Sequence, residues 1–286
     1  MQNPVFANDQ TFSANGQTYR PPMAQQATMS PPAQPTNLPP MGQASTISAG
    51  QLDAMYAAPS AGPVDTGRIT YDDVIVKTGG LLALVILTGA VSWIVMPGLW
   101  MVGAPVGFIL AMINIFRKKI SPVLITLYAV AMGVFVGGIS RFYEAYFDGV
   151  VLQAVGATLA VFLATLGLFA SGKVRASKRM TKIFLVALVG YVLFAIINAI
   201  MVWTGQLPAF GVYSWEIMGM PAAMVIGVLV VLLGAYSFVL DFESIKFAVE
   251  QGAPRIFSWR SAFGLLVTII WLYLEMLRII AASRSR

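Results

Sequence analysis

Seven runs of apolar residues follow one another along the chain, separated by short segments that are polar or rich in glycine and proline. The runs cover residues 78 to 97, 99 to 116, 121 to 140, 149 to 171, 183 to 204, 219 to 240 and 262 to 282. Each is near the length of roughly twenty residues with which a helix crosses the hydrocarbon of a bilayer. Within lipid every backbone amide must find a partner inside its own segment, which a helix provides. The pattern predicts an all-α integral membrane protein with about seven transmembrane helices.

The composition agrees with lipid as the solvent of this chain. Hydrophobic residues make up 58% and charged residues 10% of the 286. The mean hydropathy is +0.77, which is too apolar for an ordinary soluble globule. The net charge of +6 comes from Lys and Arg in short clusters between the apolar runs, where they orient helices in a membrane. We therefore expect the lipid bilayer as a partner and no nucleic acid.

The N-terminal residues 1 to 66 differ from the rest of the chain. They contain ten of the sixteen prolines and many Gln, Ser and Ala, with Asp9, Arg20, Asp53 and Asp65 as their charges. Such a stretch buries too little apolar surface to offset the entropy of ordering it. We predict a disordered Pro/Gln-rich tail over residues 1–66 and a membrane domain over residues 67–286. The tail is either passive or a docking segment for another protein.

The charged connections predict the orientation in the membrane. Basic residues gather after the second, fourth and sixth runs, at Arg117, Lys118, Lys119, Lys173, Arg175, Lys178, Arg179, Lys182, Lys246, Arg255 and Arg260. The alternate connections hold Arg141 with the acids Glu144, Asp148 and Glu216. By the positive-inside rule, the N-terminus is cytoplasmic. Arg284 and Arg286 would then lie on the opposite side if the last helix crosses fully, and a re-entrant last helix is the alternative.

Several classes of chemistry are excluded by the residue types present. The chain has no Cys and no His, so disulfides, thiolate zinc sites and Ser-His or Cys-His catalysis are ruled out. We expect no enzyme activity and no cofactor.

Glycines four residues apart, at Gly103 and Gly107 and at Gly133 and Gly137, predict places where two helices approach closely.

Two acids inside or beside the apolar runs are the candidate functional residues. Glu275 lies well inside the last run, and Asp241 lies where the sixth run ends. A carboxylate at depth costs several kcal/mol unless it is paired, hydrated or protonated. An ion pair with Arg278 three residues on would explain Glu275, and a helix end at the membrane interface would explain Asp241.

The alternative is that the two acids face each other and share a proton, because two carboxylates in contact cannot both ionise cheaply. A proton would then hold the helices together at lower pH. At higher pH, repulsion or a cation between the acids would favour another packing. Asp241 and Glu275 would bind Ca²⁺ weakly, since two carboxylates supply at most four of the six to eight oxygens that this ion takes.

At these residues the chain resembles the Bax inhibitor-1 family, also called the transmembrane Bax inhibitor motif or YccA-like family. The resemblance covers roughly residues 68 to 280 and is most specific at Leu240-Asp241 with Ile245, and at Leu272-Tyr273-Leu274-Glu275. The opening Thr70-Tyr71-Asp72-Asp73-Val74 and the polar tail are similar to a bacterial subgroup. The resemblance implies seven helices with a central last helix, and a pH-dependent Ca²⁺ leak sensed by Asp241 and Glu275. It also implies an arginine latch, for which Arg117 is the candidate.

We therefore expect a pH-sensitive, calcium-permeable leak channel, multi-pass in the inner (plasma) membrane, with Ca²⁺ as permeant or weakly bound ion. One alternative is a non-conducting membrane regulatory protein that binds proteases or other partners. The N-terminal tail is a possible binding segment for such a partner. A second is a proton-coupled transporter, because a buried acid in a helix bundle is a usual proton relay.

Overall fold

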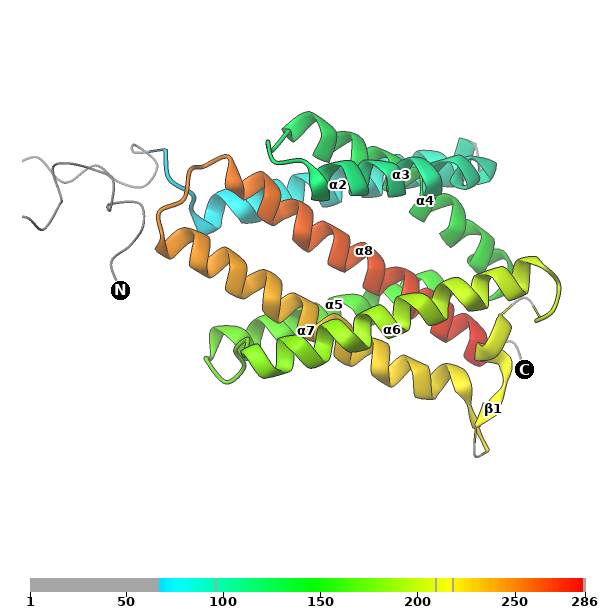
Figure 1. Ribbon diagram of the computed structural model, residues 1–286. Helices are drawn as coiled ribbons and strands as arrows, with labels where there is room; N and C mark the ends of the chain where they lie inside the picture. Colours follow the sequence, from blue (N-terminus) through cyan, green and yellow to red (C-terminus); the bar gives the residue numbers. More distant parts are fainter. Residues whose placement is uncertain (1–66, 96, 209, 218, 285–286) are drawn as a thin grey trace, which may run out of the picture. The chain divides into compact units, whose positions relative to one another are not determined.

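The computed structural model describes residues 67–95, 97–208, 210–217 and 219–284. Over these residues it forms seven α-helices: α2 (Tyr71–Val95), α3 (Trp100–Phe116), α4 (Pro122–Tyr146), α5 (Val150–Ala170), α6 (Lys178–Trp203), α7 (Ala222–Glu250) and α8 (Phe257–Arg284). The prediction of an all-α membrane protein with about seven helices is confirmed (Figure 1). The predicted disordered tail, residues 1–66, lies outside the described residues.

Short elements complete the connections. A 3-10 turn, η1 (Pro97–Leu99), joins α2 to α3, and a second, η2 (Gly211–Ser214), follows α6. A two-stranded antiparallel hairpin, β1 (Glu216–Ile217) and β2 (Met220–Pro221), leads into α7. Six of the seven described helices are long and apolar enough to cross a membrane, and α3, with 17 residues, is the shorter one.

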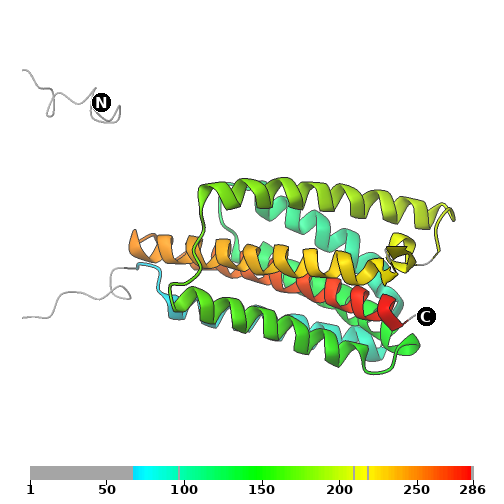
Figure 2. The same cartoon turned by 90° about the horizontal axis from the view of Figure 1, so that it is seen from below.

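The last helix is the centre of the bundle. α8 packs against α2, α4, α5 and α7. It buries 61% of its most apolar stretch, against 17% to 44% for the other five long helices. Figure 2 shows α5 and α6 on opposite sides of α7 and α8. The central position of the last helix, implied by the family resemblance, is confirmed.

Glycines let α2 and α4 pack closely. A Cβ added at Gly137 would lie 2.1 Å from the carbonyl oxygen of Gly89, and one at Gly133 would lie 2.7 Å from that of Val85. Ser92 of α2 donates a hydrogen bond of 2.9 Å to the carbonyl oxygen of Val134 at the same contact. The glycine pair of the third apolar run therefore marks a close helix contact, as predicted.

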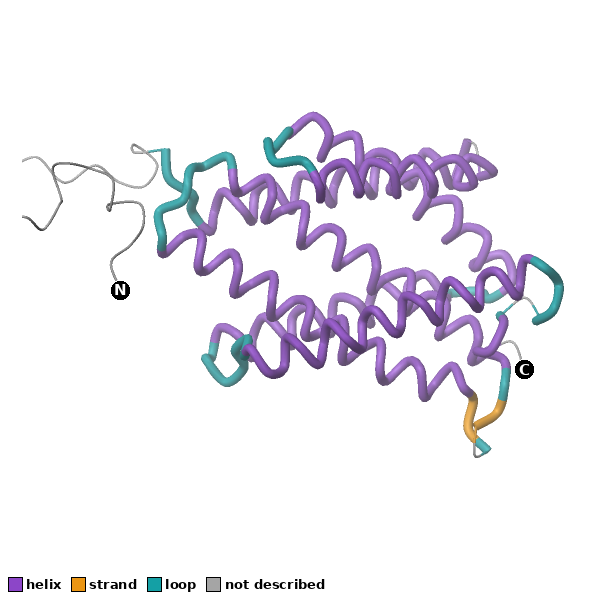
Figure 3. Tube along the Cα trace, in the orientation of Figure 1, coloured by secondary structure: helices purple, strands orange, loops and turns teal. Residues whose placement is uncertain are grey.

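The connections gather at two ends of the bundle (Figure 3). We call "basic end" the one that holds the start of α2 and the α3–α4, α5–α6 and α7–α8 connections. At this end the backbone N–H of Ile69 donates to the carbonyl of Ala253, at 2.8 Å. At the opposite end, Arg284 donates to the carbonyl of Asp148 in the α4–α5 connection, at 2.7 Å. The last helix therefore runs from one end of the bundle to the other.

Candidate functional site

Asp241 belongs to the stripe of α7 that faces α8. Buried residues of α7 recur at helical spacing on this stripe, at Gly227, Val230, Gly234, Phe238 and Ile245, and Asp241 falls in the same series. Its side chain is half-buried. A Cβ at Gly264 of α8 would lie 3.4 Å from Asp241 Oδ1, so the absence of a side chain there leaves room for the carboxyl group.

The partners of Asp241 are neutral hydroxyls. Thr268 Oγ1 of α8 donates a hydrogen bond of 2.7 Å to Asp241 Oδ2. Thr268 Oγ1 also lies 3.3 Å from Ser237 Oγ, and since the Thr268 proton goes to Asp241, Ser237 is the donor in that pair. No ion pair joins Asp241 to a Lys or Arg among the described residues. The carboxyl group therefore sits at the α7–α8 contact without a compensating charge.

Glu275 has a charged partner on its own helix. The side chain is only 7% exposed, and Arg278, three residues on, pairs with its Oε2. Arg278 also donates to the hydroxyl of Tyr191, and its guanidinium carbon lies 4.2 Å from the ring centroid of Tyr213. The two tyrosine hydroxyls are 3.3 Å apart. Glu275 therefore belongs to a buried network that ties α8 to α6 and η2.

The structure does not bring Asp241 and Glu275 together, which corrects the expectation of a shared proton between them. Asp241 is bound to Thr268, and Glu275 lies seven residues further along α8, about 10 Å at 1.5 Å per residue. The register of the helix pair sets this gap. Added Cβ atoms at Gly227 and Gly234 would meet Ile279 and Leu272 of α8. Glu275 is therefore level with a part of α7 two or more turns away from Asp241.

The structure also separates the latch candidate from the acid. Arg117 follows the last turn of α3 and is exposed. It lines a small cavity with Lys119 and Arg260 at the basic end. Among the described residues no hydrogen bond or ion pair joins it to Asp241. Arg278, not Arg117, is the basic side chain that pairs with Glu275.

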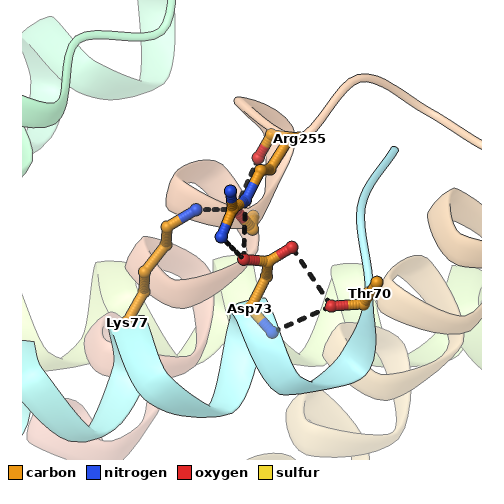
Figure 4. Close-up of polar contacts among 5 residues, drawn as sticks. Thr70, Asp73, Lys77 and Arg255 are labelled. Atoms are coloured by element: carbon orange, nitrogen blue, oxygen red, sulfur yellow. Dashed lines mark hydrogen bonds and ion pairs between the residues drawn. The ribbon is translucent and has the colours of Figure 1, made fainter. Parts of the chain in front are cut away.

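A second buried acid, Asp73, was missed by reasoning from the sequence (Figure 4). Thr70 Oγ1 accepts from Asp73 N and donates to Asp73 Oδ2, both at 3.1 Å. Arg255 in the α7–α8 connection binds Asp73 Oδ1 through Nε at 2.8 Å and Nη2 at 2.7 Å. Lys77, one turn on, donates to Ser258. Thr70 followed three residues later by Asp73 is typical of a helix N-terminus, which is a local signal for Asp73, but nothing local pointed to Arg255.

Among the described residues, no group of three or more acids is placed to hold a metal ion.

A bundle of apolar helices with buried ionisable side chains around a central last helix defines a multi-pass α-helical membrane protein. The family model described as Bax inhibitor 1 like matches residues 3–285, and the chain belongs to this family. The match extends over N-terminal residues that the resemblance from sequence, 68 to 280, left out. No curated protein matches the chain.

Proposed function

We propose that the chain is a pH-sensitive, calcium-permeable leak channel of a bacterial inner membrane, with Asp241 as its proton-responsive group. The observation that carries this proposal is the position of Asp241 at the α7–α8 contact, where its described partners are hydroxyls and no cation. An uncompensated carboxylate between helices costs free energy that a proton, water or an entering cation would remove.

The proposed gate works through the packing of α7 on α8. With a proton on Asp241 the contact is neutral and the two helices stay packed. Loss of the proton leaves a negative charge in a half-buried position, which favours an arrangement that admits water and cations. Ca²⁺ would take oxygens from Asp241, neighbouring hydroxyls and water, and such a shell binds weakly. Weak binding suits permeation better than storage.

Glu275 has a different part in this proposal. It lies on the same face of α8 as Thr268, about two turns further along, so a cation would meet the two acids in succession. Arg278 compensates Glu275 in the packed arrangement, and we propose that Arg278 is the latch partner of that acid. A passing cation has to compete with this guanidinium.

The orientation follows from the distribution of charge. The basic end carries the described Lys and Arg clusters of three connections, whereas the opposite end carries Arg141 and Arg284 with Glu144, Asp148 and Glu216. By the positive-inside rule we assign the basic end, and with it the N-terminal side of α2, to the cytoplasm.

The test is Ca²⁺ uptake into liposomes that contain the purified full chain, measured from about pH 5 to pH 8, the range in which proteins are usually most stable. We expect uptake to rise with pH in the wild type, because deprotonation of Asp241 favours the open arrangement. Asp241→Asn mimics the protonated acid and should give low uptake at every pH. Glu275→Gln should keep the pH response. The control Asp72→Asn removes a charge from an exposed side chain at the start of α2 and should behave as wild type.

Two results would overturn the proposal. If Asp241→Asn retains the wild-type pH response, Asp241 is not the proton-responsive group. If wild-type liposomes take up Ca²⁺ no faster than protein-free liposomes at any pH, the chain is not a channel for this ion. The second result would favour a non-conducting regulatory protein.

A further inference from the structure

Two apolar cavities join into one groove between α2 and α5. One has a volume of about 580 Å³ and is also lined by α4 and α8. The other has a volume of about 600 Å³ and extends toward the basic end, where α7 contributes to its wall. Both are lined by Thr78, Leu82 and Phe162. Because α2 and α5 each pack against α8, α8 forms the floor of the groove.

The groove is as long as the apolar part of a bilayer is thick. Residues of α2 line it from Tyr71 to Ile94, which is about 35 Å of helix, against about 30 Å of hydrocarbon. The volumes fall in the range typical of sites for small molecules, roughly 300 to 1,000 Å³. A long, thin and mostly apolar ligand fits such a shape.

Charge is confined to one end of this groove. Arg175 and Lys246 line the cavity at the basic end, whereas the other cavity has no Asp, Glu, Lys or Arg among its lining residues. The guanidinium carbon of Arg175 lies 4.4 Å from the ring centroid of Phe169, which fixes it at the rim. Lys246 Nζ is 3.6 Å from Glu250 Oε1, a loose pair of partly exposed side chains. An anion therefore fits this end and an apolar chain fits the rest.

A buried hydroxyl lies between the two parts. Thr78 is 8% exposed, and its Oγ1 has no hydrogen-bond partner among the described residues. A buried hydroxyl without a partner costs free energy, so an acceptor atom supplied by a ligand would stabilise the site. Thr78 lines both cavities, and a ligand that runs along the groove passes this hydroxyl.

We propose that the α2–α5 groove binds an anionic glycerophospholipid from the leaflet at the basic end. Its phosphate contacts Arg175 and Lys246, an ester carbonyl accepts the Thr78 proton, and an acyl chain runs past Leu82 and Phe162 into the far cavity. The order of these groups in the groove, cations, then a hydroxyl, then apolar walls, is the order of chemistry in such a lipid. The site is separate from Asp241 and does not depend on ion conduction.

The test is a titration of the purified full chain in detergent with phosphatidylglycerol and with phosphatidylcholine of the same acyl chains, read by native mass spectrometry. We expect phosphatidylglycerol to bind about tenfold more tightly, because each basic residue near an anionic lipid contributes a severalfold gain. Equal binding of the two lipids would overturn the proposal. So would competition by inorganic phosphate alone, since a free anion needs no apolar groove.

Two charge variants separate this site from the general basic character of the same end. Arg175→Gln with Lys246→Gln should remove the preference for phosphatidylglycerol. Lys173→Gln with Arg179→Gln removes the same charge from exposed residues that do not line the groove and should leave the preference unchanged. An equal loss in both pairs would show a diffuse electrostatic attraction and overturn the site.

Two further variants test the apolar and hydroxyl contacts. Gly79 lines the groove and its neighbour Gly80 does not, and a Cβ at either would meet no atom within 4 Å. Gly79→Leu should reduce binding of both lipids, whereas Gly80→Leu should not. Thr78→Val should weaken both lipids about threefold, the effect of one hydrogen bond, and keep the preference. Unchanged binding in both Gly79→Leu and Thr78→Val would contradict a lipid in this groove.

Discussion

Arg278 is a partly buried cation whose charge is balanced within one helical turn. Its partners are Glu275 on α8 and the hydroxyl of Tyr191 on α6, and its guanidinium lies over the ring of Tyr213. A buried ion pair adds little net stability, but removal of one partner leaves the other charge uncompensated, at a cost of several kcal/mol. The network therefore holds the C-terminal half of α8 in one position.

We predict that Glu275→Gln lowers the free energy of unfolding by about 3 kcal/mol, because the partly buried Arg278 loses the carboxylate that balances its charge. Thermal unfolding in detergent measures the loss. In the double variant Glu275→Gln with Arg278→Gln, the cost should be smaller than the sum of the two single costs, since neither charge is stranded. Strictly additive costs would contradict an interaction between the two side chains.

The sequence singled out Asp241 and Glu275, but it did not single out Asp73 or show how the three acids are arranged. Glu275 stood out because apolar residues flank it on both sides, and the pair with Arg278 was one of its two explanations. Its distance from Asp241 depends on the register of α7 against α8, which the packing of Leu272 beside Gly234 helps to set. The partner of Asp73 is 182 residues away. No local sequence pattern predicts the register between two helices or a partner that is far away in the sequence.

At the scale of the helices, the existence of each span was predictable and its ends were not. The sixth apolar run stops at residue 240, but α7 continues to Glu250. In the extra turns Phe242 and Ile245 are buried while Ser244 and Phe247 are exposed, so this end of the helix is amphipathic. Hydropathy detects the apolar length of a helix, whereas α7 ends where Gly252 takes a positive φ and the N–H of Ala253 donates back to the carbonyl of Ala248.

The contact between α2 and α4 tests the role of glycine at a helix pair. We predict that Gly137→Ala lowers the free energy of unfolding by about 2 kcal/mol, because the added methyl group would overlap the Gly89 backbone and force the helices apart. Gly156→Ala in α5 is the matched control, since a Cβ there meets no atom within 4 Å, and it should be neutral or slightly stabilising. Unfolding in detergent compares the two, and equal effects would show that the close approach is unimportant.

At the scale of the whole described bundle, the segment that precedes α2 is joined to the α7–α8 connection. Backbone bonds link Ile69 to Ala253 and Arg255 to Gly67, and the Asp73–Arg255 ion pair reinforces them. The beginning of α2 is therefore anchored to the connection that leads into the central helix. Any movement of α7 against α8 has to carry this anchor with it or break it.

The path of α8 makes a prediction about membrane topology. α8 ends beside Asp148, at the opposite end from Lys173, so the two ends of the bundle should face different compartments. The chain has no Cys, which allows single cysteines to be labelled in intact cells with a thiol reagent that does not cross membranes. We expect Gln206→Cys and Arg284→Cys to be labelled from outside the inner membrane, and Lys173→Cys only after the cells are opened. Labelling of Arg284→Cys together with Lys173→Cys would mean that α8 does not cross the bilayer, and would remove Glu275 of α8 as the second acid after Asp241 on the proposed ion path.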